Sequence, residues 1–180
     1  MVLYETERLI IRQWQKKDYR DLFEYASDVK VTKYLHFKTY KNIGTAKERI
    51  ASLLDGYKDG KIANEYAIMT KDSKKVIGCV NIAAYFPQAG GIARIGYTLN
   101  SNFQGKGYAT EAVRGLINYL MVNNIAKRVE AVHDVDNEKS GNVLKHVGMK
   151  FEGILRKRGE NNFHSRYDQA QYSILWEDMD

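Results

Sequence analysis

The stretch Ile95-Gly96-Tyr97-Thr98-Leu99-Asn100-Ser101-Asn102-Phe103-Gln104-Gly105-Lys106-Gly107-Tyr108-Ala109 joins three sequence patterns without a break. Apolar residues alternate with small or polar ones from 95 to 99, which predicts a half-buried strand. From 109 to 121 apolar residues recur at steps of three and four, which predicts an amphipathic helix. Between them, two glycines let the main chain approach a ligand, and the first helical turn leaves several N–H groups without partners. The stretch therefore predicts a strand, an anion-binding loop and a helix in succession.

Two better-known glycine loops are excluded. A Walker loop needs a glycine, four further residues and then Gly-Lys followed by Ser or Thr, and no such string occurs. A dinucleotide fingerprint needs Gly or Ala three places after its second glycine, where this chain has Thr110. The loop is instead described by Gln-x-x-Gly-x-Ala, from Gln104 to Ala109.

Length and composition predict one domain. The chain has 180 residues, 44% of them hydrophobic and 28% charged, and we expect a single domain over residues 1–180. No apolar run is long enough to cross a membrane and no signal-peptide pattern opens the chain, so we expect a cytoplasmic protein without a membrane partner. Cys79 is the only cysteine and lies in an apolar run, which indicates a core residue rather than a nucleophile.

The charge of the chain is basic but dispersed. The net charge is +6, which favours an anionic ligand such as a nucleotide cofactor. Basic residues are spread through the chain except at Arg156-Lys157-Arg158, and no recognition motif is visible, so we expect no direct nucleic-acid role. The four histidines lack metal-ligand spacing, and we expect no metal.

The rest of the chain predicts an α/β (α+β) fold. Strands are predicted at 3–14, 65–70, 76–85, 92–99, 128–133, 151–156 and 168–176. Helices are predicted from a cap at Asp18 to Ser27, from Ile43 or Thr45 to Tyr57, from 109 to 121, and from a cap at Asp136 or Asn137 to an end at Gly148. The strand, helix, strand unit around the loop places it at the carboxyl end of its strand, where open sheets bind ligands.

Three separated motifs together resemble one family. Gln-x-x-Gly-x-Ala resembles the pyrophosphate loop of the GNAT family of acetyl-CoA-dependent N-acetyltransferases. Thr6-Glu7-Arg8-Leu9-Ile10-Ile11-Arg12 and Ile95-Gly96-Tyr97 with its loop look like the RimJ/RimL branch, which acetylates protein N-termini, especially of ribosomal proteins. Asn137-x-x-Ser140-x-x-Val143-Leu144, ending in Gly148-Met149, resembles the second cofactor element of that branch.

The resemblance implies a fold and a cofactor site. The GNAT fold has a mixed, mostly antiparallel sheet, here of about seven strands, with helices on both faces and a splay at the acetyl-CoA site. The pantetheine arm is then expected on main chain at Thr98, Leu99 and Asn100 and on the Asn137 amide, for which a plain N-cap is the alternative. The pyrophosphate is expected on the loop residues Gln104, Gly105, Lys106, Gly107, Tyr108, Ala109 and Thr110.

The expected chemistry is direct attack of an amine on a thioester. By resemblance Ser140 is a hydroxyl near the thioester sulfur, with a helix-start serine as the alternative, and main-chain N–H near Leu99 is the candidate oxyanion donor. Many relatives carry Glu where this chain has Arg94, so the base is open. Glu160 roughly matches a Glu that acts through water in some Rim-type enzymes; Glu152 and His133 are further candidates.

Three functions remain open at this point. The first is acetylation of a protein N-terminal amine, and the second is acetylation of a polyamine, aminoglycoside or amino acid. The third is a non-catalytic acyl-CoA-binding module. The acceptor wall inferred from Trp14 to Tyr57, with Trp14, Tyr34, Phe37 and Tyr40, and from Arg156 to His164 is aromatic and basic, which counts modestly against polycationic acceptors; core packing is the alternative for these aromatics. Dimers are common in the family, and the aromatic C-terminal strand is a candidate homodimer interface.

Overall fold

The structure is a computed structural model that describes residues 1–58, 65–87, 90–161 and 165–179. Its strands are β1 (Val2–Glu5), β2 (Leu9–Arg12), β3 (Glu65–Thr70), β4 (Val76–Phe86), β5 (Ile92–Leu99), β6 (Arg128–Asp134), β7 (Lys150–Glu160) and β8 (Arg166–Leu175). Its helices are α1 (Tyr19–Ala26), α2 (Val29–Thr32), α3 (Ile43–Gly56), α4 (Tyr108–Val122) and α5 (Glu138–His146), with short 3-10 turns η1 (Lys16–Asp18), η3 (Ser101–Phe103) and η4 (Trp176–Asp178).

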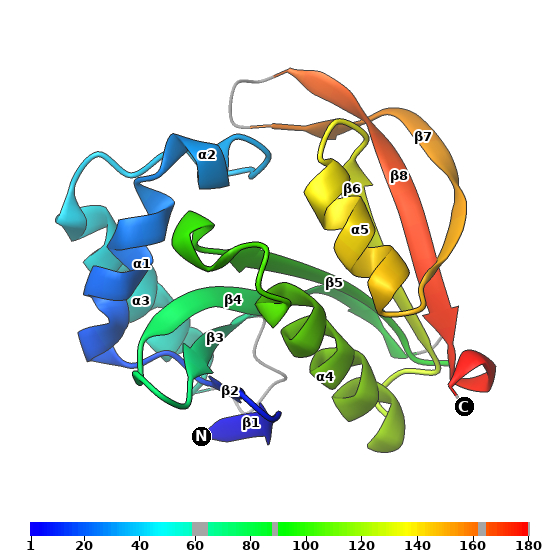
Figure 1. Cartoon of the computed structure of the whole chain (residues 1–180), viewed down its shortest axis with the longest axis horizontal. Coiled ribbons are helices and arrows are strands. Elements are labelled where there is room, and N and C mark those ends of the chain that lie inside the picture. The colour runs from blue at the N-terminus through cyan, green and yellow to red at the C-terminus, as the bar shows by residue number, and fades with distance from the viewer. Residues whose placement is uncertain (59–64, 88–89, 162–164, 180) are drawn as a thin grey trace.

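All eight strands form one sheet in the order β1-β2-β3-β4-β5-β6-β8-β7. Neighbouring strands are antiparallel except β5 and β6, which run parallel and are joined through α4. The parallel pairing is short: Ile92–Ile95 lie opposite Arg128–Ala131, and the register stops there although both strands continue. Figure 1 shows β5 and β6 diverging beyond this point. The predicted splay is therefore present, and it begins after Ile95.

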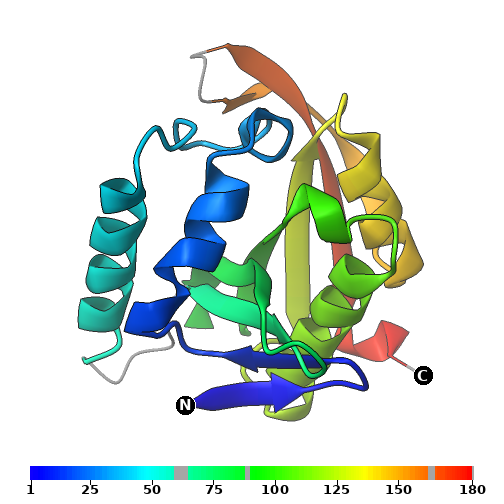
Figure 2. The same ribbon diagram turned by 60° about the vertical axis from the view of Figure 1, so that its left-hand side comes forward.

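Helices cover both faces of the sheet, as predicted (Figure 2). On one face Leu116 of α4 packs into a core with Ile95 of β5. On the other face Leu22 of α1 and Ile50 of α3 pack into a second core that includes Cys79. Burial raises the pKa of the Cys79 thiol, so this residue is an unreactive core side chain, and its predicted role is confirmed.

The prediction of about seven strands is low by one because the segment 3–14 is divided by a turn. The Thr6 N–H donates to the Leu9 carbonyl at 3.0 Å, and the Leu9 N–H donates to Thr6 Oγ1 at 3.1 Å. Glu111 of α4 fastens the turn, since its Oε1 accepts from the Thr6 hydroxyl at 2.6 Å and from the Arg8 N–H at 2.8 Å. A residue on a distant helix therefore divides the strand, and local alternation does not show it.

Asp18 takes the N-cap position of α1, as predicted, but its side chain makes no cap hydrogen bond to the helix. Its carboxylate accepts two hydrogen bonds from Arg12, at 2.7 and 3.0 Å, and one from the Gln15 N–H at 2.8 Å. Both charged side chains are almost fully buried. The ion pair attaches the turn before α1 to β2, so the side chain that was expected to cap the helix joins helix and sheet instead.

The start and end predicted for α5 are confirmed. Asn137 Oδ1 accepts from the Ser140 N–H at 3.4 Å, which caps the helix, and Gly148 with φ +88° follows its last turn. The predicted C-terminal strand is β8, which lies between β6 and β7. Because both of its edges are paired, β8 has no free edge with which to extend the sheet into a second copy of the chain.

In the described ranges no helix is long and apolar enough to cross a bilayer.

Candidate active site

The splay leaves the β5 main chain after Ile95 without a strand partner on its β6 side, while β4 remains paired with it on the other side. The Asn100 N–H donates to the carbonyl of Ile77 in β4 at 2.8 Å. Because successive main-chain groups of a strand point to opposite sides, the Leu99 N–H points away from β4, toward the splay. The Leu99 carbonyl accepts from Gln104 Nε2 at 3.1 Å, which ties the following loop back to the end of the strand. Of the predicted stretch 98–100, Leu99 is the residue whose N–H is directed into the opening.

The loop before α4 has the backbone that its two glycines predict. Gly105 and Gly107 have φ of +76° and +80°, and Gly107 is the N-cap of the helix. A Cβ added to Gly105 would meet nothing within 4 Å, so open space lies above the loop. The N–H groups of the first turn of α4, at Tyr108, Ala109 and Thr110, have no intrahelical acceptor. Loop and helix start together offer main-chain donors beside open space, which suits a pyrophosphate.

Arg8 holds this loop, and sequence reasoning gave it no role. Its Nη1 donates to the Lys106 carbonyl at 3.0 Å and its Nε to Glu111 Oε2 at 2.6 Å. Its guanidinium lies 4.4 Å from the centre of the Tyr108 ring. Although partial burial acts in the opposite direction, hydrogen bonds from Thr6 and Arg8 lower the pKa of Glu111, so this carboxylate stays charged. Arg8 belongs to the N-terminal motif Thr6–Arg12, which could have drawn attention to it. The sequence alone does not show that this motif contacts the glycine loop.

Two predicted loop side chains have partners within the chain. Gln104 Oε1 accepts from Lys139 Nζ of α5 at 3.1 Å while its amide nitrogen holds Leu99, so Gln104 connects the loop to both neighbouring elements. Lys106 Nζ donates to the Asn102 carbonyl at 3.3 Å and remains exposed. Lys106 therefore adds a positive charge at the edge of the loop.

Asn137 and Ser140 lie at the start of α5, and the side chain of Tyr97 in β5 contacts Ser140. Ser140 Oγ lies 2.7 Å from the Tyr97 hydroxyl oxygen, and the Tyr97 hydroxyl donates to the Ser140 carbonyl at 2.8 Å. Asn137 uses its side-chain oxygen as the helix cap, which leaves the amide N–H₂ group as a donor. The sequence places Tyr97 in a motif without assigning it a function; the structure brings it to Ser140.

The protonation of the Tyr97–Ser140 pair follows from its surroundings. Burial raises the pKa of the Tyr97 hydroxyl well above its usual range. Both hydroxyls therefore keep their protons at neutral pH. Tyr97 has one hydroxyl proton for two acceptors, the Ser140 carbonyl and Ser140 Oγ; when it donates to Oγ, the Ser140 proton is available for a hydrogen bond to a developing negative charge.

Arg94, at the position of the usual family Glu, belongs to the paired end of β5. It lies opposite Glu130 in the register, and its Nη2 is 3.1 Å from Glu130 Oε2. Glu130 also pairs with Arg128 Nε at 2.9 Å. Glu130, the acidic residue beside Arg94, is therefore held in an ion-pair network with Arg94 and Arg128.

Glu160, the candidate base, ends β7 where three segments meet. Its carbonyl oxygen lies 2.8 Å from His36 Nδ1, and the Tyr34 hydroxyl donates to the Asp136 carbonyl at 3.1 Å. These bonds join residues 29–41 to residues 134–136 and to residues 155–161 with 165–168; we call this set of segments the rim. Figure 2 shows α2 beside the ends of β6, β7 and β8. Glu160 is exposed on the rim.

Glu152, a further candidate base, is bound elsewhere. Its carboxylate accepts from Arg128 Nη2 and from the Ser173 hydroxyl, both at 2.7 Å. The Arg128 and Ser173 hydrogen bonds lower the pKa of Glu152 from its ordinary value of 4.5 to about 2. A carboxylate with so low a pKa is a poor proton acceptor at neutral pH.

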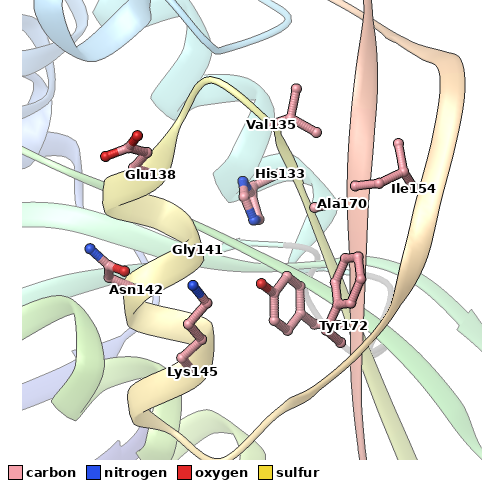
Figure 3. Close-up of a pocket in the computed structure, with 10 residues that line it drawn as sticks. His133, Val135, Glu138, Gly141, Asn142, Lys145, Ile154, Ala170 and Tyr172 are labelled. Atoms are coloured by element: carbon pink, nitrogen blue, oxygen red, sulfur yellow. The ribbon is translucent and has the colours of Figure 1, made fainter.

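His133 faces a separate pocket of about 390 Å³ between α5 and the strands β6, β7 and β8. Its Nδ1 lies 2.7 Å from the Asp134 carbonyl, and its ring packs against Gly141, where a Cβ would lie 2.9 Å from the ring. Figure 3 shows the His133 and Tyr172 rings between α5 and β8. Neither Tyr97 nor Ser140 lines this pocket, although Gly141, against which the His133 ring packs, directly follows Ser140.

The predicted aromatic wall is divided between core and rim. Trp14 is buried in the core beneath α1 and α3. Tyr34, Phe37 and Tyr40 lie on the rim, with the Phe37 and Tyr40 ring centres 5.3 Å apart. Among the described residues no three His, Cys, Asp or Glu side chains are grouped as a metal site needs.

Comparison with known sequences matches residues 8–150 to the model "Acetyltransferase (GNAT) domain". The uncharacterized N-acetyltransferase p20 of Bacillus licheniformis is 35% identical over 151 residues, which are 84% of this chain and 84% of that protein. The ribosomal protein uS5-alanine N-acetyltransferase of Escherichia coli strain K12 is 24% identical over 155 residues, 84% of this chain and 79% of that protein.

Solved structures share the fold over almost the whole chain. A GNAT-family acetyltransferase from Bacillus anthracis has a TM-score of 0.84 at 25% identity and covers 96% of this chain and 98% of its own. The microcin C7 self immunity acetyltransferase MccE, solved with acetyl-CoA and AMP, has a TM-score of 0.82 at 27% identity, covering 94% and 93%. The fold expected from the sequence motifs is confirmed by both similarities.

Proposed function

The chain belongs to the GNAT family of acetyltransferases, and from this premise we propose that it transfers the acetyl group of acetyl-CoA to the N-terminal α-amino group of a protein, with a ribosomal protein as the favoured acceptor. The observation that carries the proposal is the splay after Ile95, which is bordered by the glycine loop and by the Tyr97–Ser140 pair. The similarity to a ribosomal protein uS5-alanine N-acetyltransferase supports this class of acceptor. A cytoplasmic location, where ribosomal proteins are made, is part of the proposal.

The residues present fit acetyl-CoA. The open space above Gly105 and the donors at the start of α4 suit a pyrophosphate, which residues 104–110 would hold. Lys106 adds charge at the edge of the loop. The main chain from Thr98 to Asn100 and the amide of Asn137 would hold the pantetheine arm, since an open strand edge binds an extended ligand by main-chain hydrogen bonds. When bound there, acetyl-CoA supplies the activated acetyl thioester.

The chain's own groups then serve an acyl transfer without a covalent enzyme intermediate. The acceptor nitrogen forms a bond to the carbonyl carbon, the C–S bond breaks, and the nitrogen loses one proton. The Leu99 N–H, directed into the splay, stabilises the oxyanion that develops on the carbonyl. Ser140, positioned by Tyr97, donates a hydrogen bond to the departing thiolate.

Glu160 is the proposed acceptor of the amine proton, through a water molecule, because it lies on the rim through which an acceptor reaches the splay. The demand on it is small, since an α-amino group has a pKa of about 8 and is partly deprotonated at neutral pH. Glu160→Gln should lower kcat/KM, and the loss should shrink as pH rises above the pKa of the amine. A loss that is the same at all pH values would assign Glu160 to rim structure instead.

The test of the function is calorimetric titration with acetyl-CoA, with CoA and ATP as controls, followed by turnover with two acceptor classes. The first class is a panel of peptides with free N-termini; the second contains polyamines, aminoglycosides and amino acids. Binding of acetyl-CoA with turnover of peptides supports the proposal. Turnover of small amines alone would transfer the assignment to the second class, and binding without any turnover would indicate a non-catalytic acyl-CoA-binding module.

A further inference from the structure

The rim carries an excess of positive charge. It contains eight basic residues, Lys30, Lys33, Lys38, Lys41, Arg156, Lys157, Arg158 and Arg166, all of them exposed. Its described acidic residues are Asp134, Asp136, Glu160 and Asp168. The whole chain has 28 basic and 22 acidic residues, so the two-to-one excess on the rim is local, and the rest of the chain is close to balanced.

Part of the rim's negative charge is already engaged. Asp134 is buried, and its carboxylate accepts from the Asp136 N–H at 3.0 Å. Asp168 accepts from the Lys157 N–H at 2.8 Å, and the Lys157 ammonium lies 3.8 Å from the same oxygen. These two carboxylates are held close to the main chain of the rim, whereas all eight basic residues are exposed, although Lys157 pairs with Asp168, Arg166 Nη1 donates to the Lys157 carbonyl and Lys33 lies over the Tyr34 ring. The field at the opening is therefore positive.

The fold fixes the position of these charges on both sides. On one side, the Tyr34 and His36 hydrogen bonds across the rim hold the lysine-bearing segment 29–41 against the ends of β6 and β7. On the other side, β7 departs from its register with β8 between Leu155 and Gly159, and Lys157 has φ +50°. A bulge of this kind lifts residues out of the ladder, here the three consecutive basic residues 156–158. The lysine-bearing segment begins beside the end of β5, since the Ser101 hydroxyl donates to Asp28 Oδ2 at 2.5 Å. Both groups of cations therefore lie near the diverging ends of β5 and β6.

We propose that the acceptor is acidic next to its reactive amine: an extended protein N-terminus that carries carboxylate side chains a few residues after the first. This inference rests on the proposed function and narrows its substrate. When the terminal amine lies in the splay, the following residues must cross the rim, where carboxylates meet cations and basic side chains are repelled. Nucleic acid also carries negative charge, but its base amino groups are conjugated and non-nucleophilic, so it fits the rim without fitting the reaction.

The experiment compares three peptides of equal length that share their first residues and then carry acidic, uncharged or basic side chains. Rates with acetyl-CoA are measured at low salt and at about 0.5 M salt, where surface charges are screened. We expect kcat/KM to be on the order of tenfold higher for the acidic than for the basic peptide at low salt, with the ratio approaching one at high salt. The rim variant K33E/K38E should reverse or abolish the ratio. The variant K16E/K17E changes charge equally on η1, away from the rim, and should keep it.

The outcomes separate the inference from the function on which it rests. Because each ratio is measured within one variant, a general loss of activity does not affect it, and thermal melting shows whether each variant is folded. Equal rates for the three peptides would overturn the acidic-acceptor inference alone. No turnover of any peptide would overturn the proposed acceptor class and this inference with it. Inhibition by an RNA oligonucleotide, without any preference among the peptides, would reassign the cations to nucleic acid.

Discussion

The two ends of β5 differ in their partners: one end is paired with β6, and the other end is separated from it. At the paired end, Arg94 lies opposite Glu130, and each charged group has a partner on the neighbouring strand. At the splayed end, the Leu99 N–H is directed into the opening, and the Tyr97–Ser140 pair connects β5 to α5 instead of β6. One strand can therefore stabilise the sheet at one end and bind a ligand at the other. Main-chain and side-chain groups that are hydrogen-bonded to a neighbouring strand are not available to a ligand, whereas groups at the splayed end are. Changes at the splayed end should therefore alter activity, and changes at the paired end should alter stability.

The largest effect is expected at the loop beside the splay. Gly107→Glu adds a carboxylate to the loop that is proposed to bind the pyrophosphate, beside Arg8, whose Nη2 would lie 3.3 Å from the new Cβ; we expect the Kd for acetyl-CoA to rise about 100-fold, about 2.7 kcal/mol. Gly107→Gln is the matched control, since it has nearly the same size and the same strain at φ +80° without the charge. Calorimetry measures both. Equal affinities for the two variants would show that charge at this position is not near the ligand.

The next effect concerns the hydroxyl pair. Ser140→Ala removes the donor proposed for the thiolate, and we expect kcat to fall on the order of tenfold to 100-fold while the Kd for acetyl-CoA changes little. Tyr97→Phe should change kcat in the same direction, because it releases the Ser140 hydroxyl from its 2.7 Å contact. Steady-state kinetics together with calorimetry separate the two parameters. Unchanged kcat in the alanine variant would return Ser140 to the role of a helix-start residue.

A smaller effect is expected from the loop's support. Arg8→Ala removes the donor to the Lys106 carbonyl, and we expect KM for acetyl-CoA to rise on the order of tenfold with kcat nearly unchanged. Lys71→Ala is a suitable control, since Lys71 Nζ donates to the Thr6 carbonyl in the same turn but does not contact the loop. If both variants change KM equally, the turn as a whole supports the site and Arg8 has no special part.

The smallest effect belongs to the network next to the paired end. Glu152→Gln should lower the free energy of unfolding at pH 7 by about 1 kcal/mol, a modest value because the Glu152 side chain is 35% exposed. The pKa of Glu152 is depressed in the folded protein, so its contribution is present above its ordinary pKa of 4.5 and is lost as pH falls through about 2. Urea unfolding of parent and variant at pH 7 and near pH 2 measures this, and the difference between them should vanish at the lower pH. Loss of activity in this variant would contradict the division between the two ends.

Local patterns predicted most of the elements because hydrophobic periodicity and capping are properties of neighbouring residues. The strand Ile92–Leu99 and the cap at Asn137 were found where the patterns indicated. Two of the differences share a cause: the Asp18 side chain and the turn at Thr6 are held by partners from other elements, Arg12 and Glu111. A pattern cannot include a partner that the fold brings from far along the chain.

The sequence by itself determined the glycine loop with its helix, the order of the elements and the family to which the chain belongs. Each of these depends on contiguous residues or on short motifs, so it can be predicted from the sequence without knowing contacts between distant residues. Only the tertiary structure decided where β5 and β6 separate, that Tyr97 meets Ser140, that Arg8 holds the loop, and that two groups of cations lie near the diverging ends of β5 and β6. These features depend on strand register and on contacts between distant segments, which a single sequence does not encode locally.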